Sequence, residues 1–335
     1  MNRKYILLIV IALCVMACDS KLTQMTNRGA VFGTTYEIIY DSPNGRDLHE
    51  QIEKEMDKVN KSLSPFDSSS IISKVNRNIE TDLDDYFLTV FRKAREVSEY
   101  TDGTFDITVA PLVNVWGFGF GNKERVTPEL IDSLLQFVGY DKINVVDGRI
   151  VKENPGVILS CSAIAKGFAC DRVAALLAKN GCVNYMVEIG GEVVTKGFNS
   201  VKKREWRPAV RLPEENPLPG ASKYKAILKM NDKGIATSGN YLNFYEENGE
   251  RYGHTINPKT GYPALSNLLS VTVIADDCMT ADAYATAFMV WGFDKAVEMS
   301  NQFNNLDVYF IYDDAGEYKT WMSEGFKKFL YREME

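Results

Sequence analysis

A strand–helix–strand succession in the middle of the chain constrains the fold more than any other stretch. It comprises an apolar strand at 157–159, a helix at 163–179 and a second strand at 185–189. Asn180-Gly181 supplies a helix stop, and Gly190-Gly191 ends the second strand. Such a succession predicts a mixed α/β (α+β) fold, in which helices pack on antiparallel or mixed sheets. The order of the strands stays open at this stage.

Shorter-range patterns place further elements around this centre. A helix is expected to begin at Thr127-Pro128, where a capping residue precedes a proline, and to end at Gly139. Asp147-Gly148 predicts the turn of a hairpin. The remaining expected elements are a strand at 31–40, helices at 46–63 and 86–97, a hairpin at 143–151, a surface loop at 213–220, and helices near 279–290 and 294–303.

Residues 1–17 have the pattern of an export signal. Arg3 and Lys4 precede an apolar run that is too short to cross a bilayer comfortably. The run ends in Val-Met-Ala-Cys18, which resembles the bacterial lipobox, in which the cysteine is acylated. We therefore expect a lipoprotein leader at 1–17, a lipidated Cys18, a tether at 18–30 and a folded domain at 31–335. An ordinary cleaved signal peptide stays open as the alternative.

The leader and the charge of the chain bear on where it acts. An acylated Cys18 predicts a globular body in the bacterial cell envelope, in the periplasm or anchored to a membrane on its extracytoplasmic side. The net charge of the full chain is −7. Nonspecific binding to nucleic acid needs a basic surface, so no nucleic-acid partner is expected. No C-x-x-C pair occurs, and the four cysteines beyond Cys18 are interpreted as buried thiols.

The richest polar stretch is GHTINPKTGYP at 253–263, which holds one of the two histidines of the chain. His254 ends a strand-like segment and heads a sharp turn, the kind of position where a histidine acts in proton transfer. A structural role for His254 is weighed equally. Downstream, Asp282 and Thr286 lie four residues apart on one face of a predicted helix. Their oxygens suit Mg²⁺, although Asp282 can instead cap or pair on the helix surface.

Two other clusters have the composition of ligand-binding loops. Ser160 to Gly167 begins a helix with small and hydroxyl residues, and Lys166 adds a positive charge one turn in, which suits an anion. Ordinary helix capping explains the same residues. Residues 103–108 (GTFDIT), with Trp116 further on, bring glycine and aromatics together, as around a planar ring or simply in a core.

Taken together and in order, these segments resemble the ApbE family of FAD:protein FMN transferases, also called thiamine-biosynthesis lipoproteins. The resemblance runs from about Val31 to Gly292. It is carried by FGT (32–34), LSPFDSSSI (63–71), GTFDITVAPLVNVWGFG (103–119), SAIAKGFACD (162–171), IGG (189–191), IATSGNYLN with HTINPKTGYP (235–263) and MTADAYAT (279–286).

The resemblance implies an ApbE-like flavin transferase fold with a catalytic domain at 31–335. It implies an enzyme that binds FAD and Mg²⁺ and attaches the FMN half of FAD to a Ser or Thr hydroxyl of a partner flavoprotein, releasing AMP. The implied acceptor is a subunit of a membrane electron-transport complex.

By motif match, the resemblance also implies roles for individual residues. Phe66 would stack on the flavin. Phe32, Thr104, Phe105 and Asp106 would line the pocket for FAD. Lys166, His254 and Ile256 would contact FAD as well. Asp282, Thr286 and the backbone carbonyl of Ala163 would bind the metal. His254 is the expected base for the acceptor hydroxyl, and Asp282 is the other candidate.

Ser160 departs from the family pattern, which has Asp at this position among the residues that contact the ligand. A neutral hydroxyl there changes FAD binding by about 1–3 kcal/mol, the value of one charged hydrogen bond. Phe32 replaces the usual Met, an apolar exchange. Two alternatives stay open: a Mg²⁺-dependent FAD pyrophosphatase that yields FMN and AMP, and a non-catalytic FAD-binding lipoprotein.

Overall fold

The computed structural model describes residues 22–119, 125–213, 223–240, 244–247, 250–264 and 266–334. The predicted leader and Cys18 lie outside these ranges, and so does nearly all of the loop expected at 213–220. Within the described ranges, no helix has both the length and the apolar character needed to cross a bilayer.

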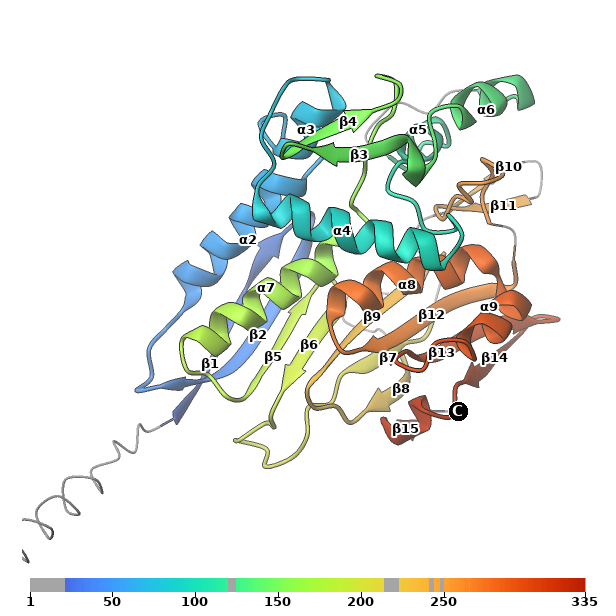
Figure 1. Cartoon of the computed structure of the whole chain (residues 1–335). Helices are drawn as coiled ribbons and strands as arrows, with labels where there is room; N and C mark the ends of the chain where they lie inside the picture. Colours follow the sequence, from blue (N-terminus) through green and yellow to red (C-terminus); the bar gives the residue numbers. More distant parts are fainter. Residues whose placement is uncertain are drawn as a thin grey trace, which may run out of the picture.

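An eight-stranded sheet in which every pair of neighbours is antiparallel forms the centre of the fold (Figure 1). Its strands, in order across the sheet, are β1 (Leu22–Val31), β2 (Thr34–Pro43), β5 (Tyr185–Ile189), β6 (Glu192–Lys196), β9 (Lys233–Gly239), β12 (Leu268–Ala275), β13 (Asp307–Asp314) and β14 (Glu317–Met322). This order confirms the antiparallel option of the predicted fold class.

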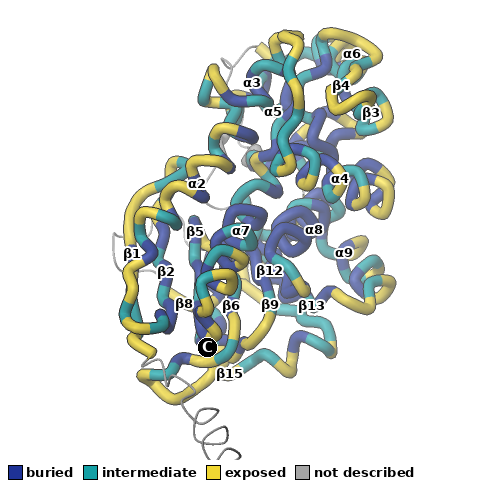
Figure 2. The backbone as a smooth tube through the Cα atoms, turned by 60° about the vertical axis from the view of Figure 1, so that its left-hand side comes forward, coloured by how far each residue is buried: buried dark blue, intermediate teal, exposed yellow. Residues whose placement is uncertain are grey.

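Helices cover one face of this sheet and enclose the main core with it. They are α2 (His49–Leu63), α4 (Asp85–Tyr100), α7 (Ala165–Lys179), α8 (Cys278–Trp291) and α9 (Phe293–Ser300). Figure 2 shows α8 buried along most of its length, whereas the outer side of α2 is exposed. The apolar stripes expected at 46–63 and 86–97 are confirmed as the buried faces of α2 and α4.

A second, three-stranded sheet packs on the opposite face. It consists of β15 (Leu330–Glu333), β8 (Tyr224–Leu228) and β7 (Ala209–Arg211). The alternation of side chains along β13 shows how one strand serves both cores: Val308 and Phe310 pack toward the helices, whereas Tyr309 and Ile311 pack toward the small sheet. The result is a layer of helices, the large sheet and the small sheet in succession.

The remaining described elements surround one end of the large sheet or join its strands. They are α3 (Ile71–Asn76), α5 (Ala110–Val115), α6 (Pro128–Leu135), η1 (Tyr140–Lys142), η2 (Phe326–Lys328) and the hairpins β3 (Ile143–Val146)–β4 (Arg149–Lys152) and β10 (Phe244–Glu247)–β11 (Glu250–Gly253). Thr127 caps α6 as expected, and Asp147-Gly148 forms the predicted turn with positive φ at both residues.

The strand predicted at 157–159 is wrong. Val157 and Leu159 are buried, but the backbone N and O of Leu159 pair with the side chain of Asn76 and not with another strand.

Three boundaries also differ from the expectation. The strand expected at 31–40 is interrupted by the turn at 32–33 between β1 and β2, and the helix expected to end at Gly139 ends at Leu135. The third concerns the tether. Residues 22–30, expected in the tether at 18–30, belong to β1, which pairs along its whole length with β2. The run LTQMTNRGA shows little apolar alternation, because β1 is an edge strand with most of its side chains exposed. The described fold therefore includes residues 22–30, and Leu22 is four positions after Cys18.

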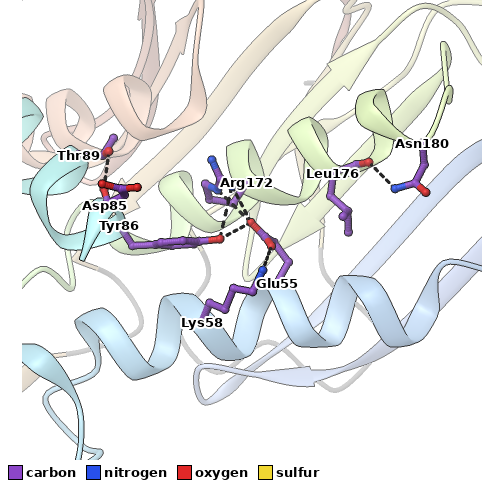
Figure 3. Close-up of polar contacts among 8 residues, drawn as sticks. All are labelled: Glu55, Lys58, Asp85, Tyr86, Thr89, Arg172, Leu176 and Asn180. Atoms are coloured by element: carbon purple, nitrogen blue, oxygen red, sulfur yellow. Dashed lines mark hydrogen bonds and ion pairs between the residues drawn. The ribbon is translucent and has the colours of Figure 1, made fainter. Parts of the chain in front are cut away.

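An ion pair with a buried carboxylate and a half-exposed arginine ties three helices of the covering layer together (Figure 3). Glu55 of α2 is 5% exposed, and its Oε1 accepts hydrogen bonds from Tyr86 of α4 at 2.6 Å and from Arg172 Nη2 of α7 at 2.9 Å. The Arg172 guanidinium also lies 4.8 Å from the centre of the Tyr86 ring, within cation–π distance. These contacts fix α7, which leads into the site described below.

We expect Arg172→Met to lower the free energy of unfolding by about 2–3 kcal/mol, because it removes one of the two cations that pair with the buried Glu55 carboxylate and leaves Lys58 and Tyr86 as its donors. Thermal or urea unfolding measures this. The exposed Lys295–Glu298 pair is the matched control, and Lys295→Met should change stability by less than about 0.5 kcal/mol. Equal losses in the two variants would refute the special contribution of the Glu55–Arg172 pair.

Candidate active site

A cavity of about 490 Å³ lies at the start of α7, next to α8 and the surrounding loops. Its walls come from segments far apart in the sequence: the loop at 104–119, the start of α7, the Gly190-Gly191 turn, β7, β9, the turn after β11 and α8. A volume of this size is in the range of cofactor and substrate sites.

The predicted site residues converge on this cavity with one exception. Those that line it are Phe66, Thr104, Phe105, Asp106, Ser160, Ala163, Lys166, His254, Ile256, Asp282 and Thr286. Phe32 is not among its lining residues. Phe32 occupies the β1–β2 turn with φ of 52°, next to Gly33 at 74°, and its half-buried ring packs against the main core. The tight turn that joins β1 and β2 therefore determines where the Phe32 ring packs.

Helix α8 presents Asp282 and Thr286 to the cavity one turn apart, as predicted. Asp282 is 3% exposed, so the alternative of a surface cap or surface pair is wrong. Thr286 Oγ1 lies 3.2 Å from Ser238 Oγ of β9. The helix begins with Asp277, whose side chain accepts from Thr280 N at 2.7 Å and caps it.

The approach of α7 to α8 depends on Gly167. A Cβ at this position would lie 2.3 Å from the backbone oxygen of Cys278 and 2.8 Å from Cβ of Asp282. Because glycine permits this approach, Gly167 N donates to Asp282 Oδ2 at 3.0 Å. One amide of the predicted anion site at the start of α7 is therefore used from within the protein, where it orients the Asp282 carboxylate.

We expect Gly167→Ala to destabilise the chain by about 1–3 kcal/mol, because the added methyl meets backbone that cannot rotate away. The FMN transfer that the family resemblance implies should fall with it, since Asp282 is displaced by the same clash. Differential scanning calorimetry and a transfer assay measure the two effects. Ala175→Ser adds an atom on the exposed side of the same helix and should cost about 0.5 kcal/mol. A Gly167→Ala protein as stable as the parent would contradict the close approach.

Lys166 is held in the cavity wall by Glu192, the first residue of β6. Its Nζ donates to Glu192 Oε1 at 2.6 Å, and Glu192 is 3% exposed. Burial alone would lower the pKa of Lys166, but the carboxylates of Asp282 and Glu192 outweigh it and raise the pKa above its ordinary value. Lys166 therefore keeps its positive charge in the cavity wall, whereas burial raises the pKa of its partner Glu192 to about 7.

Asp106 organises the loop that forms another wall. Its Oδ1 accepts from Thr108 N at 2.7 Å and from Thr108 Oγ1 at 2.6 Å, and Thr108 Oγ1 in turn accepts from Gly139 N. Burial raises the pKa of Asp106 to about 6, although the hydrogen bonds from Thr108 oppose the shift. Asp106 thus shapes the loop as well as lining the cavity.

The turn after β11 brings His254 and Ile256 to the cavity. Asn257 N donates to Tyr262 O, and Gly261 N donates to Asn257 O, which closes the turn. Trp116 Nε1 donates to Gly261 O at 2.8 Å and fastens the turn to the α5–α6 cluster. The His254 ring lies edge-on to Phe118, with centroids 6.3 Å apart. A turn anchored in this way holds the imidazole at a defined place on the cavity wall.

The oxygens that face the cavity suit a hard cation. The described ranges contain no group of three or more His, Cys, Asp or Glu side chains arranged to hold a metal. The predicted set is of another kind, with one carboxylate, one hydroxyl and the Ala163 carbonyl. Magnesium takes few protein ligands and completes its shell with water and phosphate oxygens, so this set fits Mg²⁺.

Comparison with known proteins identifies the family of the chain that carries this cavity. The sequence model of the ApbE family matches residues 32–310. The chain belongs to the ApbE family. It is 36% identical to the FAD:protein FMN transferase of Haemophilus influenzae over 338 residues, with 96% of each chain covered. It is 32% identical to the enzyme of the same name from Escherichia coli K12, with 97% of each chain covered.

Solved structures agree with the ApbE assignment. The flavin transferase ApbE of Vibrio cholerae superposes with a TM-score of 0.82 at 34% identity, covering 92% of this chain and all of that one. The apo flavinyl transferase ApbE of Pseudomonas stutzeri gives 0.82 at 28% identity, covering 93% and 98%. The family and fold that the motifs predicted are confirmed.

Several residues of the ApbE cavity escaped the sequence analysis as site residues. Arg211 of β7 and Ser238 of β9 line it. Ser238 belongs to the quoted IATSGNYLN segment but was given no role of its own, and Arg211 lies outside every quoted segment. Asp171 lies behind it, at the end of the SAIAKGFACD segment, and its two oxygens accept from Cys278 N and Met279 N at 2.9 and 2.8 Å. Burial raises the pKa of Asp171 to about 7. Asp171 thus fixes the start of the helix that carries Asp282.

The four described cysteines, Cys161, Cys170, Cys182 and Cys278, are buried and free, which confirms their interpretation as structural thiols. Burial raises the pKa of the Cys161 thiol to about 12, so it stays protonated. None of them lines the cavity.

Proposed function

We propose that the chain transfers the FMN moiety of FAD to a Ser or Thr hydroxyl of a partner flavoprotein and releases AMP. The observation that carries the proposal is the convergence of Asp282, Thr286, Lys166 and His254 on one cavity of a chain that belongs to the ApbE family. Relatives at up to 36% identity over nearly their whole length are named FAD:protein FMN transferase.

We propose that Asp282, Thr286 and the Ala163 carbonyl hold Mg²⁺. When bound there, the metal neutralises charge on the FAD diphosphate. The contribution of the chain is to orient the ligands. Gly167 N fixes one oxygen of Asp282, and Ser238 holds the hydroxyl of Thr286.

The other cavity residues have separate tasks in this proposal. Lys166, kept charged by its two carboxylate neighbours, supports a phosphate oxygen of FAD. Phe66, which is 77% exposed and lies at the wall of the cavity, covers the flavin ring. His254 takes the proton of the acceptor hydroxyl as that oxygen attacks the FMN phosphorus and the AMP phosphate leaves. The new bond is a phosphoester between the acceptor and FMN.

We also propose an acylated Cys18 and a position on the extracytoplasmic side of a bacterial membrane. The proposal rests on the apolar run and the Val-Met-Ala-Cys18 pattern of the sequence. The acceptor in this compartment is proposed to be a subunit of a membrane electron-transport complex.

The direct test is to incubate the purified chain with FAD, Mg²⁺ and a candidate acceptor domain. We expect the mass of the acceptor to increase by one FMN, with one AMP released for each modified acceptor. Rapid AMP release without acceptor would support the pyrophosphatase instead. Tight FAD binding with no AMP under either condition would support a non-catalytic binding protein.

Ser160 gives a further prediction about FAD affinity. Its Oγ lies 3.0 Å from Ser162 Oγ and accepts from Ser162 N at 3.4 Å, so the hydroxyl organises the start of the α7 segment. We expect Ser160→Asp to leave the Kd for FAD unchanged or to lower it by up to about ten-fold, since a carboxylate accepts the same hydrogen bonds more strongly. Fluorescence titration with FAD measures it, and Ser160→Asn is the uncharged control. A large loss of affinity in the Asp variant would show that the pocket is built around the hydroxyl.

A further inference from the structure

The loop between β6 and β7 carries an apolar and basic surface, and residues 198–205 of this loop do not line the cavity. We define the β6–β7 tip as Phe198, Val201, Lys202, Lys203 and Arg204. Phe198 is 49% exposed and Val201 is 68% exposed. Lys202, Lys203 and Arg204 are exposed as well, and Glu205 is the one acidic residue in the run 201–205. Exposed apolar and basic side chains are thus adjacent in this loop, on a chain whose net charge is −7.

The tip has a defined conformation. Asn199 and Arg204 form a β-bridge, and Lys202 N donates to Asn199 Oδ1 at 2.8 Å. Lys203 has φ of 49°, the left-handed conformation of a tight turn. These contacts hold Val201 and the two lysines at the apex of the loop, so their exposure is built into the turn.

The tip lies at the end of the large sheet where the folded chain starts. Leu22, the first residue of β1, pairs with Pro43 at the end of β2. Two residues before Pro43, Asp41 accepts from Ser200 Oγ of the loop at 2.8 Å and from Asn184 Nδ2 at 2.9 Å. Val183, beside Asn184, adds a third exposed apolar side chain at 57%. Figure 1 shows β1 starting at this same lower end of the sheet.

The proposed lipid anchor places this end of the molecule against the membrane. Only three residues separate Cys18 from Leu22. Even fully extended, the four Cα–Cα steps from Cys18 to Leu22 span about 14 Å. The start of β1, and with it the β6–β7 tip, must therefore lie close to the headgroups of the bilayer that holds the acyl chains.

We infer that the β6–β7 tip is a membrane-contacting surface that binds an anionic bilayer. Phe198 and Val201 enter the boundary between headgroups and acyl chains, and the three cations meet lipid phosphates. This contact would fix the orientation of the anchored body, which a short tether alone leaves free to tilt. The inference rests on the proposed lipid anchor, and it adds to that anchor a second, reversible contact.

The test uses the mature chain from residue 18 with Cys18→Ser, which removes the anchor and leaves the whole described fold. Flotation measures its partition onto vesicles of pure phosphatidylcholine and onto vesicles with 30% phosphatidylglycerol. We expect preference for the anionic vesicles, weakened by salt. Lys202→Ala/Lys203→Ala should lower that partition by roughly twenty-fold. Phe198→Ser/Val201→Ser should lower it by roughly ten-fold.

Matched controls remove the same charge and the same apolar surface elsewhere. Lys295→Ala/Lys319→Ala changes α9 and β14, and Val146→Ser/Val151→Ser changes the β3–β4 hairpin, where both valines are about as exposed as Phe198. The controls should partition as the parent does. A parent that does not prefer anionic vesicles, or controls that lose as much as the tip variants, would overturn the inference.

The outcome is separable from that of the proposed function. The tip variants should still transfer FMN to a soluble acceptor domain. If the parent fails to transfer FMN but its vesicle binding depends on the tip, the proposed function fails and the membrane contact stands. If tip variants keep vesicle binding and lose transfer only to a membrane-embedded acceptor, the tip contacts protein and the membrane contact is refuted.

Discussion

Asp282→Asn is expected to lower kcat/KM for FMN transfer at least a thousand-fold while the chain stays folded. The amide is nearly isosteric, and its oxygen still accepts from Gly167 N, so α7 and α8 keep their approach. What is lost is the negative charge of a carboxylate that is 3% exposed, at the place where the cavity is proposed to hold Mg²⁺. Removing one strong electrostatic stabiliser of a transition state costs about two to three orders of magnitude, and losing the metal adds to it.

The measurements for Asp282→Asn are the transfer rate, the Mg²⁺ dependence of FAD binding and the melting temperature. FAD binding should lose its dependence on Mg²⁺. The control is Asp277→Asn at the start of the same helix, where asparagine caps as well as aspartate and activity should stay within a few-fold of the parent. Near-normal transfer by the Asp282→Asn protein, with its Mg²⁺ dependence intact, would remove the proposed metal site.

His254→Gln is expected to lower the transfer rate by about 10²–10⁴-fold with little change in FAD affinity. The imidazole lies on the cavity wall in an anchored turn, and glutamine fills similar space without accepting a proton near neutrality. FAD is held by many other side chains, so its Kd should change by no more than about three-fold. Single-turnover kinetics and FAD titration separate the two effects, and the pH dependence of the rate should flatten.

His49→Gln is the natural control, because His49 is the other histidine of the chain and lies on α2. It should transfer FMN at the parental rate. A His254→Gln protein that loses FAD affinity and rate by the same factor would make His254 a binding residue. In that case Asp282 becomes the stronger candidate for the base.

Local signals predicted several elements of this fold, but they wrongly predicted a strand at 157–159. The Thr127 cap, the Asp147-Gly148 turn and the stripes of α2 and α4 are each determined by neighbours within a few residues. The cavity residues were found for a different reason. Their motifs are those of the ApbE family, and the resemblance to that family predicted that they lie in one site. The spacing of the residues in the sequence does not predict this.

The features that could not be predicted from the sequence depend on contacts between distant segments. The order of the sheet puts β9 between β6 and β12, and no local pattern encodes it. Residues 22–30 were predicted as part of a tether because their side chains are mostly polar and exposed. They form a strand because their backbone pairs with β2. Asp171 acts through amides that are more than a hundred residues away in the chain, at Cys278 and Met279. Phe32 does not line the cavity, because the β1–β2 turn with positive φ packs its ring against the main core.

The length of β1 has a consequence for which substrates are reachable. Ten residues of strand, about 33 Å, separate Leu22 from the β1–β2 turn, and Gly190 of the cavity wall donates to Thr35 O just beyond that turn. With Leu22 held near the bilayer by the proposed anchor, β1 places the cavity up to about 30 Å above the membrane surface. Under the proposed anchor, an acceptor therefore needs to carry its hydroxyl on a domain or loop that projects by this distance from the bilayer. A hydroxyl at the bilayer surface would not be modified.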